Sequence, residues 1–491
     1  MHPRVSQDII KSISIMAKYL KQKPRKDKLR KPKKGKISKQ SKKPKSIARP
    51  SEKDDALDDT IQSSKKKPSK VELKSVIAAL KKNPELLTIR KALKYIPYYL
   101  KSEGLTKKII KEIIQLWAEA GEQIRVVCLL CLIRLFTKLK DAEKRQMIAT
   151  KLYNTFLDKC RVTKNDNMSM IGFMRHSLVE LYKIDPEIAF KQAQTSCNQL
   201  SITLKNACTH KNEETYKTVL NWQYANCLIL LTKLIISHEE NSQVRALTNQ
   251  AIQLNLGALN LMSSPRYLPF YCHLIENLIC LSEASRSFIP ILPQLMRILE
   301  KLDIPLEKKV KAAPKTNGKK KQKNGGKSRS DDDESDVEKD DDKEDSSEHG
   351  SEEDEEVKVK KQYNMDLLNH VSLEEAHNLE YNVAVLNKVC DLLLIYLANQ
   401  SHRIAFPELI LLPRIQIKKW LKKNPGQPAQ RLKNLLEKIN SDCEKVEEQR
   451  RHIDFAFTDF VAVDAWEKKL RDTGCLSLPK ALKQLENGHA K

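Results

Sequence analysis

The stretch from Ile124 to Leu139 reads IRVVCLLCLIRLFTKL, and apolar side chains cover almost the whole circumference of the helix it would form. A helix at the protein surface keeps one polar face, so this pattern predicts a helix that is buried on more than one side. The preceding stretch, Ile109–Trp117, carries apolar residues at the spacing of a helix with a single buried face. Together the two stretches indicate packed helices, with Ile124–Leu139 covered on both sides.

Helical periodicity continues along most of the remaining chain, and no convincing alternating strand pattern is present. We therefore predict an all-α fold. Long helices joined by short loops favour an irregular HEAT- or armadillo-like helical-repeat solenoid, although no fixed repeat is recognisable, and a compact multi-helix bundle is the alternative. The predicted helices span residues 71–82, 109–117, 124–139, 144–162, 168–183, 186–207, 213–236, 244–261, 268–282, 290–302, 373–400, 409–422 and 427–452.

Composition divides the chain into five parts. Charged segments with little apolar content are predicted to be disordered. A short amphipathic helix is expected at 5–20, and it has three interpretations: a frayed terminal helix, a docking helix for a partner, or a transit peptide. The parts are a basic disordered tail (1–70), a helical-repeat region (71–305), a disordered basic-then-acidic insertion (306–362), a C-terminal helical region that continues the array (363–475) and a tail (476–491).

The charge of the chain points to a polyanionic partner. Lys and Arg number 89 against 63 Asp and Glu, which gives a formal charge of +26. Residues 331–356 contribute −15 of this, so the rest of the chain carries +41. Such an excess favours nucleic acid as a partner. The expected phosphate contacts in the two basic tails are Lys31, Lys33, Lys34, Lys42, Lys43, Lys319, Lys320 and Lys321, and the expected nuclear-import cluster is Arg30, Lys31, Lys33 and Lys34.

The acidic segment contains three candidate phosphorylation sites. Ser330, Ser335 and Ser351 each have an acidic residue three positions later, a pattern that suits an acidophilic kinase. The alternative is that the segment is only a solvated run of charge.

Nothing in the sequence indicates catalysis, a cofactor or a metal site. Only 12 glycines are present, and none of the glycine-rich nucleotide-binding loops can be found. The pair Cys128 and Cys131 lies inside an apolar helix without a second Cys/His pair, so both are expected to be core thiols. The 11 cysteines without a secretory signal indicate a reducing compartment, and no apolar run approaches the length that spans a bilayer, so no membrane is expected.

Five groups of residues resemble the nucleolar complex protein 2 family. The resemblance covers roughly residues 72–475, with the segments in the family order. The segments are Phe173–Tyr182 (FMRHSLVELY), Asn221–Leu228 (NWQYANCL), Arg266–His273 (RYLPFYCH) with Phe288–Pro293 (FIPILP), Ser401–Glu408 (SHRIAFPE), and Arg450, Arg451, Phe455, Asp459 and Val463–Glu467 near the C-terminal end.

The resemblance implies a non-enzymatic nucleolar assembly factor for the large (60S) ribosomal subunit. It implies a helical scaffold that forms a heterodimer with a sister nucleolar complex protein, travels with pre-60S particles and their rRNA, and supports their maturation and nuclear export. The implied locations are the nucleus, nucleolus and nucleoplasm. No small-molecule substrate is expected. Two departures are notable: Phe270 and Tyr271 stand where the family usually has Leu-Arg, and the charged insertion has no assigned family role.

Thirteen residues of these segments are expected to serve folding. Trp222, Phe288 and Phe406 are expected to anchor helix packing rather than to stack on bases. Pro269, Pro290 and Pro407 are expected at helix starts, where the missing N–H costs nothing, and Glu408 is expected in a first helical turn. The full set is Phe173, Arg175, Glu180, Trp222, Tyr267, Pro269, His273, Phe288, Pro290, Phe406, Pro407, Glu408 and Trp466.

Two other functions suit a helical scaffold with charged segments. A chromatin- or histone-binding transcription regulator could use the acidic segment for histones. A nuclear transport receptor would also be a helical solenoid, but long basic tails are unusual in that class.

Overall fold

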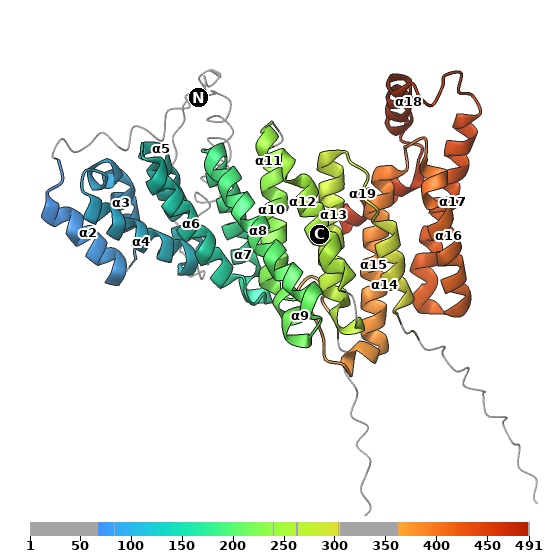
Figure 1. The fold of residues 1–491 in the computed structure, drawn as a ribbon, viewed down its shortest axis with the longest axis horizontal. Helices are drawn as coiled ribbons and strands as arrows, with labels where there is room; N and C mark the ends of the chain where they lie inside the picture. The colour runs from blue at the N-terminus through green and yellow to red at the C-terminus, as the bar shows by residue number, and fades with distance from the viewer. Residues whose placement is uncertain are drawn as a thin grey trace, which may run out of the picture.

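The computed structural model describes residues 67–82, 84–238, 240–261, 264–302, 304 and 362–489, and Figure 1 shows their arrangement. Within these residues all regular structure is α-helix or 3-10 helix, and no strand occurs. The all-α prediction is therefore confirmed. The predicted helix at 5–20, the lysines and arginine of the two basic tails, and Ser330, Ser335 and Ser351 lie outside the described residues.

The bounds of the helices are as follows. The N-terminal half contains α2 (Lys70–Lys82), α3 (Leu86–Tyr99), α4 (Glu103–Glu119), α5 (Glu122–Lys138), α6 (Ala142–Lys159), α7 (Asn165–Tyr182), α8 (Pro186–His210), α9 (Glu213–Val219) and α10 (Trp222–Ser237). The C-terminal half contains α11 (Ser242–Ala246), α12 (Thr248–Asn260), η2 (Pro265–Tyr267), α13 (Leu268–Ser285), α14 (Leu292–Glu300), η3 (Glu375–His377), α15 (Leu379–Gln400), α16 (Phe406–Lys423), η4 (Gln427–Ala429), α17 (Gln430–Arg450), α18 (Phe460–Thr473) and α19 (Ser477–His489).

The helices succeed one another along the long axis of the molecule. In Figure 1, α2 lies at one end, α16 to α18 lie at the other, and the helices between them follow broadly in chain order, except that α19 returns to lie beside α15. Their lengths run from 5 residues in α11 to 25 residues in α8. The array is thus elongated and irregular.

The first hydrophobic core is built from α2 to α7 and includes one side of α10. Helix α5 sits in its middle, in contact with α3, α4 and α7. Cys128, Leu132 and Leu135 of α5 are all buried. The prediction that Ile124–Leu139 is covered on more than one side is confirmed, because these helices take up different faces of α5.

The second core extends from α8 to α19 and joins the segments on both sides of the 305–361 gap. Helix α15 follows the gap and packs against α13 and α14, which precede it. Helix α10 belongs to both cores: Leu230 and Leu234 face the first, while Leu228 and Leu231 face the second. The C-terminal region therefore completes the same array.

Two helices that periodicity alone predicts as continuous are each divided, and a side-chain cap makes one of the two breaks. The predicted helix 213–236 is two helices, because Asn221 accepts a hydrogen bond at Oδ1 from the Tyr224 amide (2.9 Å) and so begins α10 as its N-cap. The predicted helix 244–261 is likewise divided at Leu247 into α11 and α12. Neither break, at Asn221 or at Leu247, has a glycine at the point where the helix changes.

Three helices are absent from the predicted set. Helix α3 contains Pro97 in its last turns and still packs against α2 and α5. Helix α18 exposes most of its residues and buries only Glu467 and Leu470. The predicted tail at 476–491 needs correction: Ser477–His489 forms α19, which contacts α15 and α17.

Two apolar segments, Glu213–Ser237 and Leu379–Gln400, meet a length and composition test for crossing a membrane. The expectation that no apolar run approaches that length therefore needs correction. Within the protein, 67% and 61% of their most apolar windows are buried. Their composition is that of core helices, since α10 and α15 lie inside the helical array.

Candidate functional site

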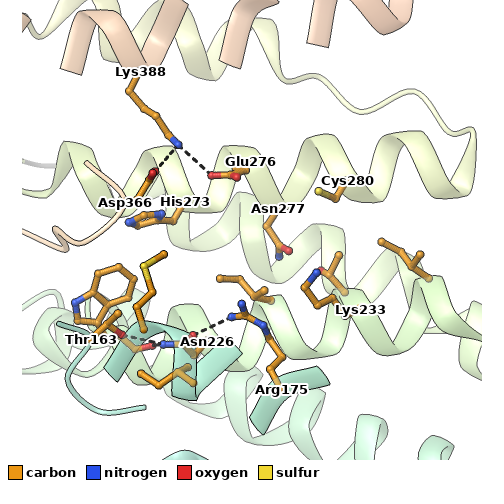
Figure 2. Close-up of a pocket in the computed structure, with 16 residues that line it drawn as sticks. Thr163, Arg175, Asn226, Lys233, His273, Glu276, Asn277, Cys280, Asp366 and Lys388 are labelled. Carbon is orange, nitrogen blue, oxygen red and sulfur yellow. Dashed lines mark hydrogen bonds and ion pairs between the residues drawn. The ribbon is translucent and has the colours of Figure 1, made fainter. Parts of the chain in front are cut away.

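We call the five groups of residues that resemble the family the recognised segments. Three of them lie far apart in the chain and meet at one pocket. Arg175 comes from α7, Trp222 and Asn226 from α10, and His273 from α13. The pocket has a volume of about 390 Å³ and is drawn in Figure 2. We call it the polar pocket, and its lining is Thr163, Met168, Ile171, Arg175, Trp222, Asn226, Ile229, Thr232, Lys233, Ile236, His273, Glu276, Asn277, Cys280, Asp366 and Lys388.

One wall of the polar pocket is cationic. The half-buried Arg175 donates from Nη1 to Oδ1 of Asn226 over 3.2 Å, as Figure 2 shows. Burial lowers the pKa of this guanidinium, which nevertheless stays charged. Among the described residues no carboxylate lies within ion-pair distance of Arg175 or of its exposed neighbour Lys233. Within the described residues this wall therefore presents two cations without an ion pair, and Glu276 acts on Arg175 only from beyond that distance.

The opposite wall contains a three-residue ionic cluster. Lys388 of α15 places Nζ 3.3 Å from Glu276 and 2.8 Å from Asp366 (Figure 2). Burial lowers the Lys388 pKa, but the two carboxylates outweigh that effect and raise it overall. The cluster ties α15, which follows the charged insertion in sequence, to α13, which precedes it, and carries one net negative charge.

The rings of Trp222 and His273 form the floor between these walls. Their centroids are 4.9 Å apart, and His273 Nε2 lies 3.0 Å from the carbonyl of Leu368. A carbonyl only accepts, so Nε2 carries the proton. Burial lowers the His273 pKa and favours the neutral ring. This pair joins two of the recognised segments and serves packing at the pocket.

A second site is an apolar groove between α14 and α16, with a volume of about 520 Å³. Phe288 and Leu412 are each 71% exposed beside it, and Ile415 is 56% exposed. The expectation that Phe288 anchors helix packing is wrong, because its side chain faces solvent. Pro290 does not begin a helix either: α14 starts at Leu292, and Pro293 occupies its first turn.

The apolar groove continues toward the C-terminal end of α16. A further hollow of about 420 Å³ shares Met296, Glu300 and Gln416 with it and extends to Lys419 and Lys423. The groove thus has an apolar end at Phe288 and Leu412 and a basic end at the last turn of α16.

Two contacts connect the recognised segments of the C-terminal half. Glu408 lies in the first turn of α16 and accepts from Arg450 Nη1 over 2.7 Å. Glu467 accepts at Oε1 from the backbone amide of Ile404 over 3.0 Å. Both fix the turn that precedes α16, beside Phe406, which is fully buried.

The remaining recognised residues lie in the helical framework. Pro269 and Pro407 occupy first turns of α13 and α16, as expected. Glu180 is buried and paired with Lys183 at 2.8 Å. Phe173, Tyr267 and Trp466 are half-buried against the two cores, and the Tyr267 ring lies 5.6 Å from that of His370.

Eight of the eleven cysteines are buried, and Cys208, Cys280 and Cys475 are exposed. Cys128 and Cys131 are fully buried in α5, and burial raises the pKa of the Cys128 thiol to about 12. Within the described ranges, no group of three or more His, Cys, Asp or Glu is placed to hold a metal ion.

Of the residues that line the polar pocket, the sequence singled out only Arg175, Trp222 and His273 as site residues. Asn226, Thr232 and Lys233 lie on α10, while Glu276 and Lys388 come from α13 and α15. The available signal was polar residues inside otherwise apolar core helices, above all Lys388 within Leu379–Gln400. A polar or charged side chain at such a position needs a hydrogen-bonding or ionic partner once it is buried.

These features define a class of protein: an elongated all-α helical array with a polar pocket and an exposed apolar groove. The Noc2p family model matches residues 143–484, which is most of the chain. The chain belongs to the Noc2p family, and its resemblance to nucleolar complex protein 2 is confirmed.

Named relatives support this assignment. The chain is 26% identical over 373 residues to "Nucleolar complex protein 2" of Drosophila melanogaster, covering 75% of this chain and 42% of that protein. It is 26% identical over 363 residues to "Protein REBELOTE" of Arabidopsis thaliana (74% and 52%), and 23% identical over 384 residues to the Arabidopsis "Nucleolar complex-associated protein 2" (78% and 44%). The chain spans about half the length of these relatives. Membership in this family assigns it to the nucleolus.

Proposed function

We propose that this protein is a non-enzymatic assembly factor for the large (60S) ribosomal subunit. In this proposal it pairs with a sister nucleolar complex protein on pre-60S particles and supports their maturation and export. Family membership and nucleolar assignment support a role in ribosome biogenesis. We propose further that the array is an irregular HEAT- or armadillo-like solenoid, whose length offers several surfaces to partners.

The observation that carries the proposal is the apolar groove between α14 and α16. Soluble proteins seldom leave neighbouring large apolar side chains exposed unless they form an interaction site. Here Phe288, Leu412 and Ile415 are exposed together beside one groove, and Phe288 belongs to a recognised segment.

We infer that the groove accepts an amphipathic helix of the sister protein, and its apolar lining supports this proposal. An apolar ridge on that helix would cover Phe288 and Leu412, and burial of this area would supply the affinity. Acidic residues at one end of the helix would approach Lys419 and Lys423 at the basic end of the groove. Glu300 also lines this end, so the two lysines leave it one net positive charge.

The charged tails complete the proposal. Lys31, Lys33, Lys34, Lys42, Lys43, Lys319, Lys320 and Lys321 would neutralise rRNA phosphates without reading sequence. Arg30 with Lys31, Lys33 and Lys34 would direct nuclear import. Phosphorylation of Ser330, Ser335 or Ser351 would deepen the negative charge of the insertion and weaken RNA contact.

Sedimentation of nuclear extract tests this function. The tagged protein is expected to co-migrate with pre-60S particles, and RNase treatment is expected to release it. Migration with nucleosomes that persists after RNase would contradict the proposal and favour a chromatin regulator instead.

A further inference from the structure

We propose that the polar pocket binds an acidic side chain of a partner protein and takes its carboxylate between Arg175 and Lys233. This site is formed by α7, α10, α13 and α15 and is separate from the apolar groove between α14 and α16. The proposal goes beyond the proposed function and does not depend on which protein occupies that groove.

The first argument is the state of Arg175. A cation that is withdrawn from water is costly unless a charged or strongly polar partner compensates it. Arg175 has one neutral partner, Asn226, whose own amide group donates to the Trp222 carbonyl over 3.0 Å. Asn226 thus fixes the guanidinium in place and leaves other N–H groups for a ligand.

The second argument is an unused hydroxyl. Thr232 lines the same pocket and is only 1% exposed, yet its Oγ1 has no hydrogen-bond partner within the described part of the chain. Buried polar groups in native proteins are almost always paired, and helical threonines normally bond to the preceding turn. A ligand oxygen that reaches the pocket would accept this hydroxyl proton.

The third argument identifies the ligand as a protein carboxylate rather than a nucleic-acid phosphate. Beside the cations, the pocket is lined by Met168, Ile171, Ile229 and Ile236, which favour aliphatic neighbours of the bound group. The opposite ionic cluster carries one net negative charge and would repel the further phosphates of an RNA chain. A single Glu or Asp beside apolar residues brings one negative charge to the cations and the aliphatic lining, where an RNA chain would bring several.

Cysteine footprinting on the full chain tests this proposal. Cys280 is exposed and lines the pocket, whereas Cys208 and Cys475 are exposed elsewhere and serve as internal controls. The probes are the blocked peptide acetyl-Leu-Glu-Leu-amide, its glutamine counterpart, and inorganic phosphate, with the rate of iodoacetamide modification read by mass spectrometry. The glutamate peptide is expected to slow modification of Cys280 only, at concentrations about tenfold lower than the glutamine peptide needs.

Two variants make the test specific. Arg175→Met keeps much of the length of the side chain and removes its charge. The glutamate peptide is then expected to protect Cys280 no better than the glutamine peptide. Lys233→Met supplies the same test if Arg175→Met does not fold, because Lys233 is exposed and makes no ion pair among the described residues. Equal protection by both peptides, protection by phosphate as strong as by glutamate, or no protection of Cys280 would each overturn the proposal.

Discussion

The Asp442 carboxylate on α17 accepts a hydrogen bond from the backbone amide of Leu478 over 2.8 Å, and its other oxygen accepts from the amide of Ser477 over 2.6 Å. Asp442 is fully buried, so one side chain of a neighbouring helix caps the start of α19. Lys445 adds a bond of 3.1 Å to the Ser477 hydroxyl. This anchor explains why the last helix lies against α17 and α15.

Replacing Asp442 tests the anchor. Asp442→Asn removes the charge and presents an amide N–H to backbone donors, which should destabilise the attachment of α19 by about 1–3 kcal/mol. Backbone amides of α19 are expected to exchange hydrogen faster, while those of α5 keep their protection. Asp464→Asn on the exposed face of α18 is the matched control, and it should change the hydrogen exchange of neither α19 nor α5. Unchanged exchange in α19 would show that apolar packing alone holds it.

His402 predicts how stability depends on pH. Its Nε2 lies 2.9 Å from Arg471 Nη2, and an arginine only donates, so this nitrogen is unprotonated. Burial, then Arg471 and Arg403, lowers the His402 pKa to about 4. An unfolded histidine titrates near 6.5, so between about pH 6.5 and 4 the unfolded chain binds more protons and stability falls as the pH falls.

The loss is expected to be about 1 kcal/mol between pH 7 and 5, after allowance for partial exposure. His402→Gln keeps an acceptor for Arg471 and cannot be protonated there, so its urea midpoint should decline less over the same range. Some decline will remain, because burial also lowers the pKa of His273. Parallel pH profiles for the two proteins would refute the role given to His402.

Thiol accessibility tests the arrangement of the cores. Cys208, Cys280 and Cys475 are exposed, and iodoacetamide should modify these three in the native protein. Burial raises the Cys280 pKa, so it should react more slowly than the other two. The buried thiols, including Cys128 and Cys131, should react only in denaturant. Native reactivity of Cys128 would contradict the central position of α5.

Two phenylalanines of the recognised segments should respond differently to truncation. Phe406 is fully buried, so Phe406→Ala should destabilise the protein by about 3–5 kcal/mol. Phe288 is 71% exposed, so Phe288→Ala should change the unfolding free energy by less than about 0.5 kcal/mol. Chemical denaturation of both variants measures the difference, and equal destabilisation would disprove the exposed position of Phe288.

Periodicity predicted most of the helices and the buried place of Ile124–Leu139, because an apolar stripe has few ways to avoid water. It failed where a local interaction decides the outcome. Asn221 ends one helix and begins another through a single cap, and α19 depends on Asp442, which lies 35 residues earlier in the chain. Single-residue caps hardly change a hydrophobic pattern.

The polar pocket was less predictable for a related reason. Arg175 and Asn226 are 51 residues apart, and Lys388 meets Glu276 across the charged insertion. Such pairs arise from helix packing rather than from spacing within one helix. Phe288 was mispredicted in the opposite direction. An aromatic residue in a recognised segment suggests a core position, but its side chain is exposed in the structure.

The central claim is that the groove between α14 and α16 joins this protein to its partner on pre-60S particles. The most direct test is sedimentation of tagged Leu412→Glu in nuclear extract beside Leu87→Glu, a control at the far end of the array whose leucine is 62% exposed. Circular dichroism should show both variants folded. We predict that Leu412→Glu leaves the pre-60S fractions and loses its partner, while Leu87→Glu behaves as the wild type. Retention of Leu412→Glu in those fractions, with its partner, would contradict the account.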